Sequence, residues 1–359
     1  MIEAPRVVLV KLAALGDVIM ASTLVGALRT RWPESQLTWV TGTPLAPLVG
    51  RLDGVDSILP VDTAALLTGR LPARVAALAA AWRAIGRQPY DLGLVAHTDP
   101  RYASLLWGAR VRAVRRFRVG PLGSPHGADA AGQDASPREW MGAAYARMLD
   151  GLNGDHPRPS PPRLARLQLS PEELARGKPA HGAVLVAPGG ARNLLRDNPL
   201  RRWPLSQWVA LTRALVAAGH RVVLVGSPED TDEAAALTAA VPAVTSLVGR
   251  TTLLELAALL ARARLLVSHD SGPMHLAALT RTPTVALFGP TDPAVFVPPG
   301  AAVVVASAAA NLPCAPCYDG KGYAACRSNR CLNEVTSVQV MRAVDVLLAD
   351  RPVQKDDTQ

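Results

Sequence analysis

The residues Leu265 to Pro293, "LLVSHDSGPMHLAALTRTPTVALFGPTDP", decide the fold. An apolar run ends at Asp270, a helical run begins around Gly272, and a second apolar run leads to Gly289. This order of strand, helix and strand is typical of a parallel, doubly wound sheet. Ligands of such sheets bind beyond the carboxyl ends of the strands, so the polar cluster at the end of the first run predicts a ligand site.

The same rhythm occurs twice along the chain. The first half alternates helical runs with the apolar runs "RVVLV" (6–10), "QLTWVTG" (36–42) and "YDLGLVAH" (90–97). The second half begins with "GAVLVAPGG" (182–190) and "HRVVLVGS" (220–227), and a Pro-, Gly- and charge-rich linker near residues 155–180 precedes it. The sequence therefore predicts an α/β protein of two Rossmann-like, doubly wound domains that face each other across a cleft.

Size and composition narrow the class of protein. The chain has 359 residues, 49% of them hydrophobic, which suffices for two cores. The net charge of +9 and the pI of about 9.9 predict an anionic partner. Only 4% of the residues are aromatic, and no recognition motif occurs, which argues against nucleic acid. The first residues do not read as a signal peptide and no apolar run reaches 18 residues, so we expect a cytoplasmic protein.

The opening stretch has the features of an anion site. Pro273 suits the first turn of a helix, where free backbone N–H groups and the helix dipole attract negative charge. Taken singly, Asp270 could be a helix cap and His275 a buried core histidine. Together they favour a site in which Asp270 accepts sugar hydroxyls and His275 donates to phosphate. The predicted members are Asp270, Ser271, Gly272, Met274, His275, Gly289 and Thr291.

A second candidate segment follows the strand that ends near Ala187. Gly189 and Gly190 allow a ligand to approach the backbone closely. Four arginines come next, and their planar groups suit phosphate; they are Arg192, Arg196, Arg201 and Arg202. The alternative is a solvated basic loop. The segment lacks the P-loop pattern.

Near the N-terminus, "VLVKLAALGDVIMAS" places Lys11, Gly16 and Asp17 between a strand and a helix. Asp17 is either an N-cap or a carboxylate that acts as a general base. The dinucleotide fingerprint G-x-G-x-x-G is absent here.

Two further clusters remain open. Four cysteines have the spacing C-x2-C-x8-C-x4-C; they are Cys314, Cys317, Cys326 and Cys331. They predict a structural zinc, with an iron–sulfur cluster or reduced thiols as the alternatives, and no catalytic role. The run "RVRAVRRFRVG" (110–120) contains Arg115 and is either a solvated face or a surface for a phosphorylated acceptor or an anionic leaflet.

The segments "VKLAALGDVIMASTLVGALR", "RRWPLSQW" and "SHDSGPMHLAALTRTPTVALFGPTDP" resemble, in this order, the landmarks of glycosyltransferase family 9, the heptosyltransferases of lipopolysaccharide core assembly. The resemblance runs from about residue 6 to residue 348. It implies the GT-B fold, with an acceptor-binding domain (1–160), a nucleotide-sugar-binding domain (178–335), a C-terminal helix that crosses back (336–350) and a tail (351–359).

The resemblance also implies an inverting transfer from a nucleotide sugar, typically ADP-heptose, to a glycolipid acceptor, with no metal required for catalysis. Asp17 aligns with the family's proposed base, and Arg201 falls where many members have a lysine that contacts the donor phosphate. Asp270, Ser271, Gly272 and His275 match the donor loop. The sequence departs from the family at "VAHTDPRYA" (95–103), where a D-x-Q-G pattern is usual.

The part of the site that binds the acceptor is therefore the least defined by the sequence. We assign four residues to it: Lys11, Gly16, His97 and Arg115. The enzyme is expected in the cytoplasm, peripheral to the anionic inner-membrane surface. Two alternatives stay open at this point: a nucleotide-sugar epimerase on the same fold, and a non-catalytic sugar-nucleotide-binding protein.

Overall fold

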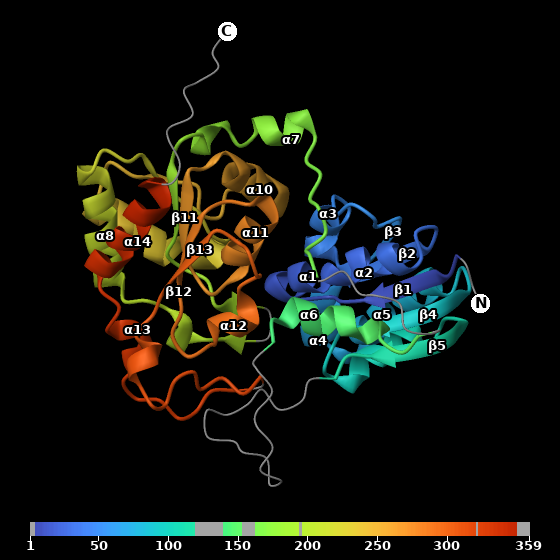
Figure 1. The fold of residues 1–359 in the computed structure, drawn as a ribbon. Helices are drawn as coiled ribbons and strands as arrows, with labels where there is room; N and C mark the ends of the chain where they lie inside the picture. Colours follow the sequence, from blue (N-terminus) through green and yellow to red (C-terminus); the bar gives the residue numbers. More distant parts are fainter. Residues whose placement is uncertain (1–3, 119–138, 153–161, 194–195, 321, 350–359) are drawn as a thin grey trace. The chain divides into compact units, whose positions relative to one another are not determined.

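A computed structural model gives the structure of the protein. It describes residues 4–118, 139–152, 162–193, 196–320 and 322–349 (Figure 1). The predicted tail at 351–359 and part of the predicted linker lie outside the described residues. The chain divides into two compact units: it passes from the first to the second between Gln168 and Leu169, and the short segment Asn193–Arg196 belongs to the first unit again. Within the described residues, no helix is sufficiently long and apolar to cross a bilayer.

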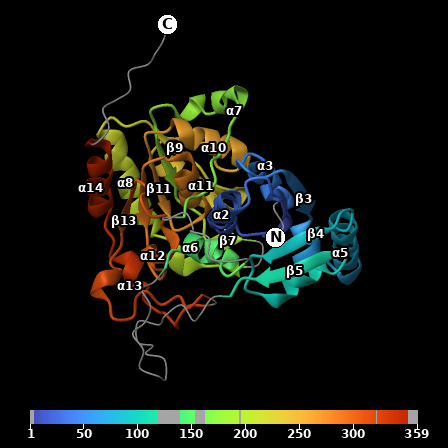
Figure 2. The same ribbon diagram turned by 45° about the vertical axis from the view of Figure 1, so that its right-hand side comes forward.

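The first unit is built on a parallel sheet of five strands in the order β3-β2-β1-β4-β5. Its strands are β1 (Arg6–Val10), β2 (Gln36–Gly42), β3 (Ser57–Val61), β4 (Tyr90–Val95) and β5 (Val111–Arg116). The helices are α1 (Leu15–Ala21), α2 (Thr23–Arg31), α3 (Ala46–Val49), α4 (Thr63–Thr68), α5 (Leu71–Ile85) and α6 (Met141–Ala146). Helices α1, α2 and α6 pack together, as Figure 2 shows for α2 and α6, and α4 packs with α5. The runs predicted as strands at residues 6, 36 and 90 are the three central strands, whose Val and Leu side chains are buried by helices.

The second unit has a parallel sheet of six strands in the order β10-β9-β6-β11-β12-β13. Its strands are β6 (Val184–Ala187), β9 (Val222–Leu224), β10 (Thr245–Ser246), β11 (Leu265–His269), β12 (Thr284–Leu287) and β13 (Val303–Ala306). The longer helices are α8 (Leu205–Ala217), α9 (Thr231–Ala240), α10 (Leu253–Arg262), α11 (Gly272–Thr280) and α14 (Ser337–Ala349). Short elements complete the chain: α7 (Pro171–Ala175), β7 (Arg192–Asn193), β8 (Arg196–Asp197), α12 (Pro293–Phe296) and α13 (Arg330–Asn333).

Helices cover both faces of this second sheet. Figure 1 shows α8 and α14 beside one face and α10 and α11 beside the other. The helix that the resemblance implied to cross back is α14, and its described contacts are with α8 and with β11, β12 and β13. The predicted fold class, two Rossmann-like α/β domains, is confirmed. At the carboxyl edge of each sheet the chain passes from strand to helix, and most of the predicted site residues lie in these loops or in the first turns of the helices that follow.

Candidate active site

The first unit brings Lys11, Asp17 and Tyr145 together at the carboxyl end of β1. The Lys11 ammonium donates to the Tyr145 hydroxyl at 2.9 Å and lies 3.5 Å from an Asp17 carboxylate oxygen. The Lys11 side chain is only 4% exposed, whereas Asp17 is 41% exposed. Burial lowers the pKa of Lys11, and the neighbouring Asp17 carboxylate acts in the opposite direction. We call these three residues the Lys11 cluster.

Asp17 is not the N-cap of its helix. The N-cap of α1 is Ala14, which makes no side-chain capping hydrogen bond, and Asp17 lies in the first turn. The capping interpretation of Asp17 is therefore wrong, although a carboxylate in the first turn still interacts favourably with the helix dipole. An exposed carboxylate oxygen beside a buried cation has the chemistry that a general base needs.

Tyr145 was missed by the sequence analysis because it lies on α6, 134 residues from Lys11. Its ring packs against Phe117, with the ring centroids 4.4 Å apart. Burial first, and then the charge of Asp17, raise the pKa of Tyr145 well above its usual value, so its hydroxyl keeps its proton and accepts from Lys11.

The other predicted acceptor residues lie along the same edge of the sheet. His97 is buried, stacks on Tyr102 at 3.7 Å and accepts the Leu12 N–H through Nε2 at 2.9 Å. Burial and then Lys11 hold the pKa of His97 well below its usual value, so the ring is neutral. Gly16 lies in α1, and Arg115 is an exposed residue of β5 opposite Leu94 of β4. Their role in acceptor binding stays a prediction; Lys11, being buried, contacts Asp17 rather than the surface.

The second unit gathers Arg201, Asp270, Thr291 and His275, which we call the Asp270 cluster. Asp270 is 2% exposed and accepts from Arg201 at 2.9 Å and from the Thr291 hydroxyl at 2.7 Å. His275 Nε2 lies 3.8 Å from the other carboxylate oxygen. Burial acts to lower the pKa of Arg201. The nearby Asp270 and Tyr323 act in the opposite direction and outweigh burial, so the pKa of Arg201 is raised. The guanidinium therefore stays charged while its side chain remains 21% exposed.

Only some of the backbone N–H groups that were predicted to be free for an anion at the first turn of α11 are free. Ser271 is the N-cap, and in the described part of the chain no carbonyl accepts from the N–H of Ser271 or Gly272. Met274, in contrast, donates its N–H to the Ser271 carbonyl at 3.1 Å, and its side chain is buried against Phe288. The Met274 N–H does not point outward, because it already forms a helical hydrogen bond.

Gly190 lies against Ser271, the N-cap of this helix, and Gly189 precedes it. Gly190 has φ +93°, and a Cβ there would lie 3.1 Å from Ser271. Its N–H donates to Asp230 at 2.8 Å, and a Cβ on Gly189 would come within 2.1 Å of the same carboxylate. Only glycine fits both positions, which is the close backbone approach that the sequence predicted.

Asp230 is buried and was missed by the sequence analysis. Beyond Gly190, it accepts from the backbone N–H and the hydroxyl of Ser227, both at 2.9 Å. The S-x-x-D spacing of a capping box was the available signal. Arg192 pairs with Glu233 at 2.8 Å and lies 3.5 Å from Asp230, and Arg202 pairs with Asp197. Of the predicted arginines, Arg201 is therefore the one that lies beside Asp270.

The remaining donor-side and cysteine predictions have mixed outcomes. A Cβ on Gly289 would lie 3.1 Å from Leu332 and 3.5 Å from Cys331, so this glycine allows the cysteine-bearing segment to pack on the loop. Cys314 and Cys326 are exposed, while Cys331 is buried. Burial, and then the three other cysteines, raise the pKa of Cys331 to about 11. Across the described residues, no group of three or more His, Cys, Asp or Glu side chains is arranged to hold a metal ion. The structural zinc stays a prediction.

Two Rossmann-like units with polar clusters at their strand ends fit a glycosyltransferase of the GT-B type. The family model of glycosyltransferase family 9 (heptosyltransferase) matches residues 78–323, and the chain belongs to this family.

Curated relatives and solved structures agree with this assignment. Lipopolysaccharide heptosyltransferase 2 of Salmonella typhimurium is 25% identical over 303 residues, which cover 79% of this chain and 82% of the relative. Lipopolysaccharide heptosyltransferase 1 of Pseudomonas aeruginosa is 27% identical over 328 residues, which cover 87% of this chain and 86% of the relative. The family 9 glycosyltransferase from Veillonella parvula has a TM-score of 0.76 at 20% identity, over 98% of this chain and 99% of that one. ADP-heptose lipopolysaccharide heptosyltransferase II of E. coli has a TM-score of 0.71 at 20% identity, and the match covers 96% of this chain and 99% of that one.

Proposed function

We propose that this glycosyltransferase moves a heptose from ADP-heptose onto a hydroxyl of a lipopolysaccharide core or a related glycan, with inversion and without a catalytic metal. The single observation that carries the proposal is the Asp270 cluster: a partly exposed, charged guanidinium that a buried carboxylate holds beside a helix N-terminus, in a chain of this family. Relatives named as lipopolysaccharide heptosyltransferases support the acceptor class. A solved E. coli heptosyltransferase with an ADP-fluoroheptose supports the donor class.

On the donor side, the leaving nucleoside diphosphate develops negative charge as the glycosidic bond breaks. Arg201 and the N–H groups of Ser271 and Gly272 would hold this charge, the arginine by charge-assisted hydrogen bonds and the amides at the positive end of α11. Asp270 keeps Arg201 oriented through the 2.9 Å ion pair. These fixed groups do the work for which other transferases use a divalent ion.

On the acceptor side, Asp17 would take the proton of the attacking hydroxyl as the new C–O bond forms. Its carboxylate is accessible, and the buried Lys11 ammonium, 3.5 Å away, holds it in place through an ion pair. One base and one departing diphosphate give a single displacement, so the configuration of the anomeric carbon inverts.

The test uses the full chain, ADP-heptose and a core acceptor without heptose. We expect ADP release that depends on the acceptor, a product one heptose heavier, an inverted anomeric centre, and unchanged turnover in EDTA. Isomerised sugar in the absence of acceptor would instead identify an epimerase. Binding of the donor without turnover under any condition would identify a non-catalytic binding protein.

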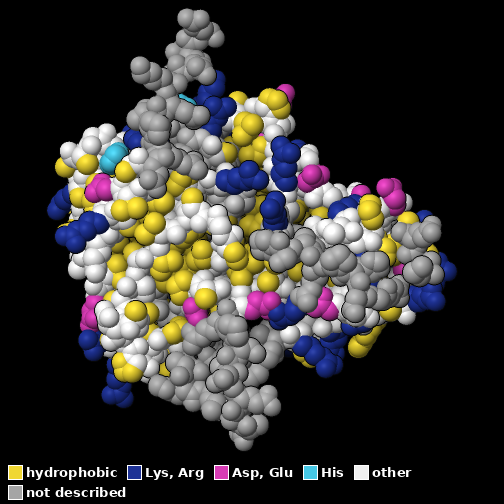
Figure 3. Space-filling view, viewed as in Figure 1, with side chains coloured by type: hydrophobic (Ala, Val, Ile, Leu, Met, Phe, Trp, Pro, Cys, Tyr) yellow, Lys and Arg dark blue, Asp and Glu magenta, His cyan; other side chains and the backbone are white. Residues whose placement is uncertain are grey.

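The basic edge of the first unit suits an anionic membrane surface. Strand β5 is the outer strand, is exposed along most of its length and carries Arg112, Arg115 and Arg116. Trp107, 78% exposed, precedes it. Figure 3, drawn as Figure 1, shows Lys and Arg side chains near this part of the unit. We propose that this edge contacts the cytoplasmic leaflet, since basic residues and interfacial tryptophan favour that surface. Co-sedimentation with phosphatidylglycerol vesicles, but not with phosphatidylcholine vesicles, is the expected result, and Arg112→Glu should weaken it.

We also propose a structural zinc on the four cysteines, with no part in transfer. Elemental analysis of the purified full chain should find about one zinc per chain, and Cys317→Ser should remove it. A chain that holds no zinc after purification without chelators would contradict this assignment.

A further inference from the structure

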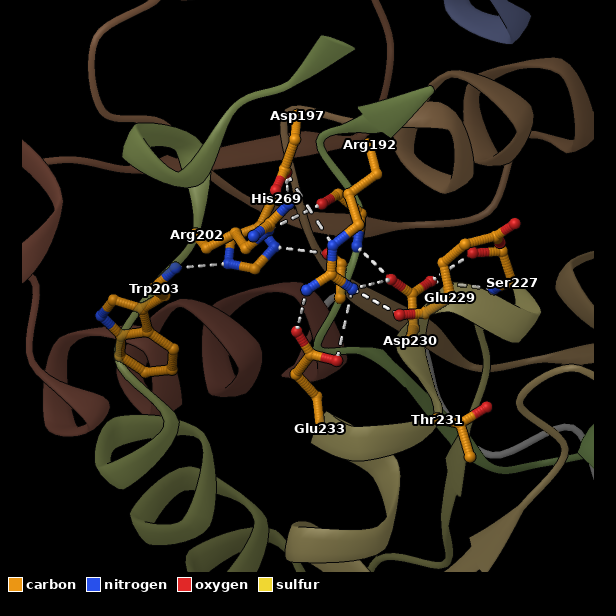
Figure 4. A network of polar contacts seen from close by, with 12 residues as sticks. Arg192, Asp197, Arg202, Trp203, Ser227, Glu229, Asp230, Thr231, Glu233 and His269 are labelled. Atoms are coloured by element: carbon orange, nitrogen blue, oxygen red, sulfur yellow. Dashed lines mark hydrogen bonds and ion pairs between the residues drawn. The ribbon is translucent and has the colours of Figure 1, made fainter. Parts of the chain in front are cut away.

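His269 ends strand β11 and is completely buried. Its Nε2 accepts the backbone N–H of Trp203 at 2.7 Å, so this nitrogen carries no proton. Its Nδ1 lies 2.9 Å from the Gly189 carbonyl and therefore holds the proton and donates it (Figure 4). Burial, as the largest cause, lowers the pKa of His269 to about 4, which agrees with a neutral ring.

The two partners of His269 belong to the two segments that carry the proposed donor site. Gly189 precedes Gly190, which lies against Ser271 at the N-terminus of α11. Trp203 follows Arg201 by two residues, and Arg201 pairs with Asp270. The imidazole thus joins the glycine loop to the arginine segment through one rigid ring. The edge of Trp208 packs against this ring, with centroids 5.2 Å apart and planes at 90°, which restricts its rotation.

His269 cannot itself touch a donor, because its side chain is completely buried and both nitrogens are occupied. Its neighbours Asp270 and Ser271 reach the site instead. Any effect of His269 on the donor must therefore act through the position of the two segments.

We propose that His269 is a positioning residue that fixes the Gly189–Gly190 loop relative to Arg201 and so sets the affinity for the diphosphate of the donor. This inference rests on the proposed donor site. Loss of the ring leaves the Gly189 carbonyl and the Trp203 N–H buried without a partner, and both segments then move to find new partners. Arg201 and the helix amides stay present but are displaced, so both the affinity for the diphosphate and its stabilisation in the transition state weaken.

The experiment compares His269→Phe with wild type and with Leu215→Ala. Leu215 is a fully buried core residue of α8, so this control is destabilised without losing either hydrogen bond. ADP, UDP and GDP are titrated calorimetrically into the wild-type chain, and the nucleotide that binds is used for the variants. His269→Phe should weaken it by about tenfold or more and raise the donor KM in step. The kcat should fall as well, because the displaced groups also hold the departing diphosphate in the transition state. Leu215→Ala should keep the wild-type Kd and KM, since partial unfolding lowers the active fraction but not the affinity of folded molecules.

Two conservative variants keep the proposal open to refutation if His269→Phe does not fold. His269→Asn preserves a donor for Gly189, and His269→Gln preserves an acceptor for Trp203, so each should bind the nucleotide with intermediate affinity. Wild-type affinity in every folded His269 variant would overturn the positioning role, as would a lowered kcat at unchanged KM. A wild-type chain that binds none of the three nucleotides would overturn the proposed function itself, and the inference with it.

Discussion

Replacing Arg201 with Met tests the buried ion pair of the Asp270 cluster. Asp270 is 2% exposed and Arg201 21% exposed, with a separation of 2.9 Å. Removal of the cation leaves a buried carboxylate that keeps the Thr291 hydroxyl as its hydrogen-bond donor. Breaking such a pair from one side costs about 3–5 kcal/mol. We therefore expect Arg201→Met, and separately Asp270→Asn, to lower the free energy of unfolding by several kcal/mol.

The measurement is a double-mutant cycle by urea unfolding, with Arg213→Met as a control. Arg213 is an exposed residue of α8 whose side chain bonds the Ala240 carbonyl at 3.2 Å, so its loss should cost less than about 1 kcal/mol. The double variant Arg201→Met/Asp270→Asn should lose less stability than the sum of the single losses, because no unpaired charge remains. Additive single losses below about 1 kcal/mol each would mean a solvated pair and would refute the reasoning.

The remaining predictions concern Asp17, His269 and Gly189. Asp17→Asn should lower kcat by about 10²–10⁴-fold and leave the Kd of ADP unchanged; weaker nucleotide binding in a folded variant would contradict its role as base. Because the pKa of His269 falls from 6.5 to about 4 on folding, the unfolded chain takes up the proton first as the pH drops. Stability is thus complete above about pH 6.5 and should decrease by about 2 kcal/mol at pH 5, a loss that His269→Asn abolishes in urea unfolding at the two pH values. Gly189→Ala, whose Cβ would lie 2.1 Å from Asp230, should cost about 1–3 kcal/mol by the same assay, and an unperturbed variant would show that the loop is not held by Asp230.

The central strands of both sheets could be predicted from the sequence, whereas the edge strands could not. β1, β4 and β11 are continuous apolar runs because helices cover both faces of a parallel sheet. β5 carries three arginines among its six residues and was interpreted as a basic run, since an exposed edge strand needs no apolar face. Its strand character comes from pairing with β4, a long-range contact that no local pattern records.

The candidate site shows the same division. Residues that follow a strand, such as Asp17, Asp270 and Gly190, were predictable because strand ends meet at one edge of a sheet. Tyr145 and Asp230 were not, because their importance depends on contacts with Lys11 and Gly190 that only the folded chain creates. The position of Asp17 within its helix could not be predicted from the sequence either, because Asp is favoured both at the N-cap and in the first turn.

The two clusters use the same kind of pair in opposite ways. In the first unit the cation is buried and the carboxylate is exposed, with Lys11 at 4% and Asp17 at 41%. In the second unit the carboxylate is buried and the cation is the more exposed partner, with Asp270 at 2% and Arg201 at 21%. The buried partner fixes the position of the exposed one, and the exposed partner is the one that a substrate can reach. An accessible carboxylate can take a proton from an alcohol, and an accessible guanidinium can hold a departing diphosphate. The sign of the exposed charge therefore agrees with the proposal that the first unit takes the acceptor and the second unit takes the nucleotide sugar.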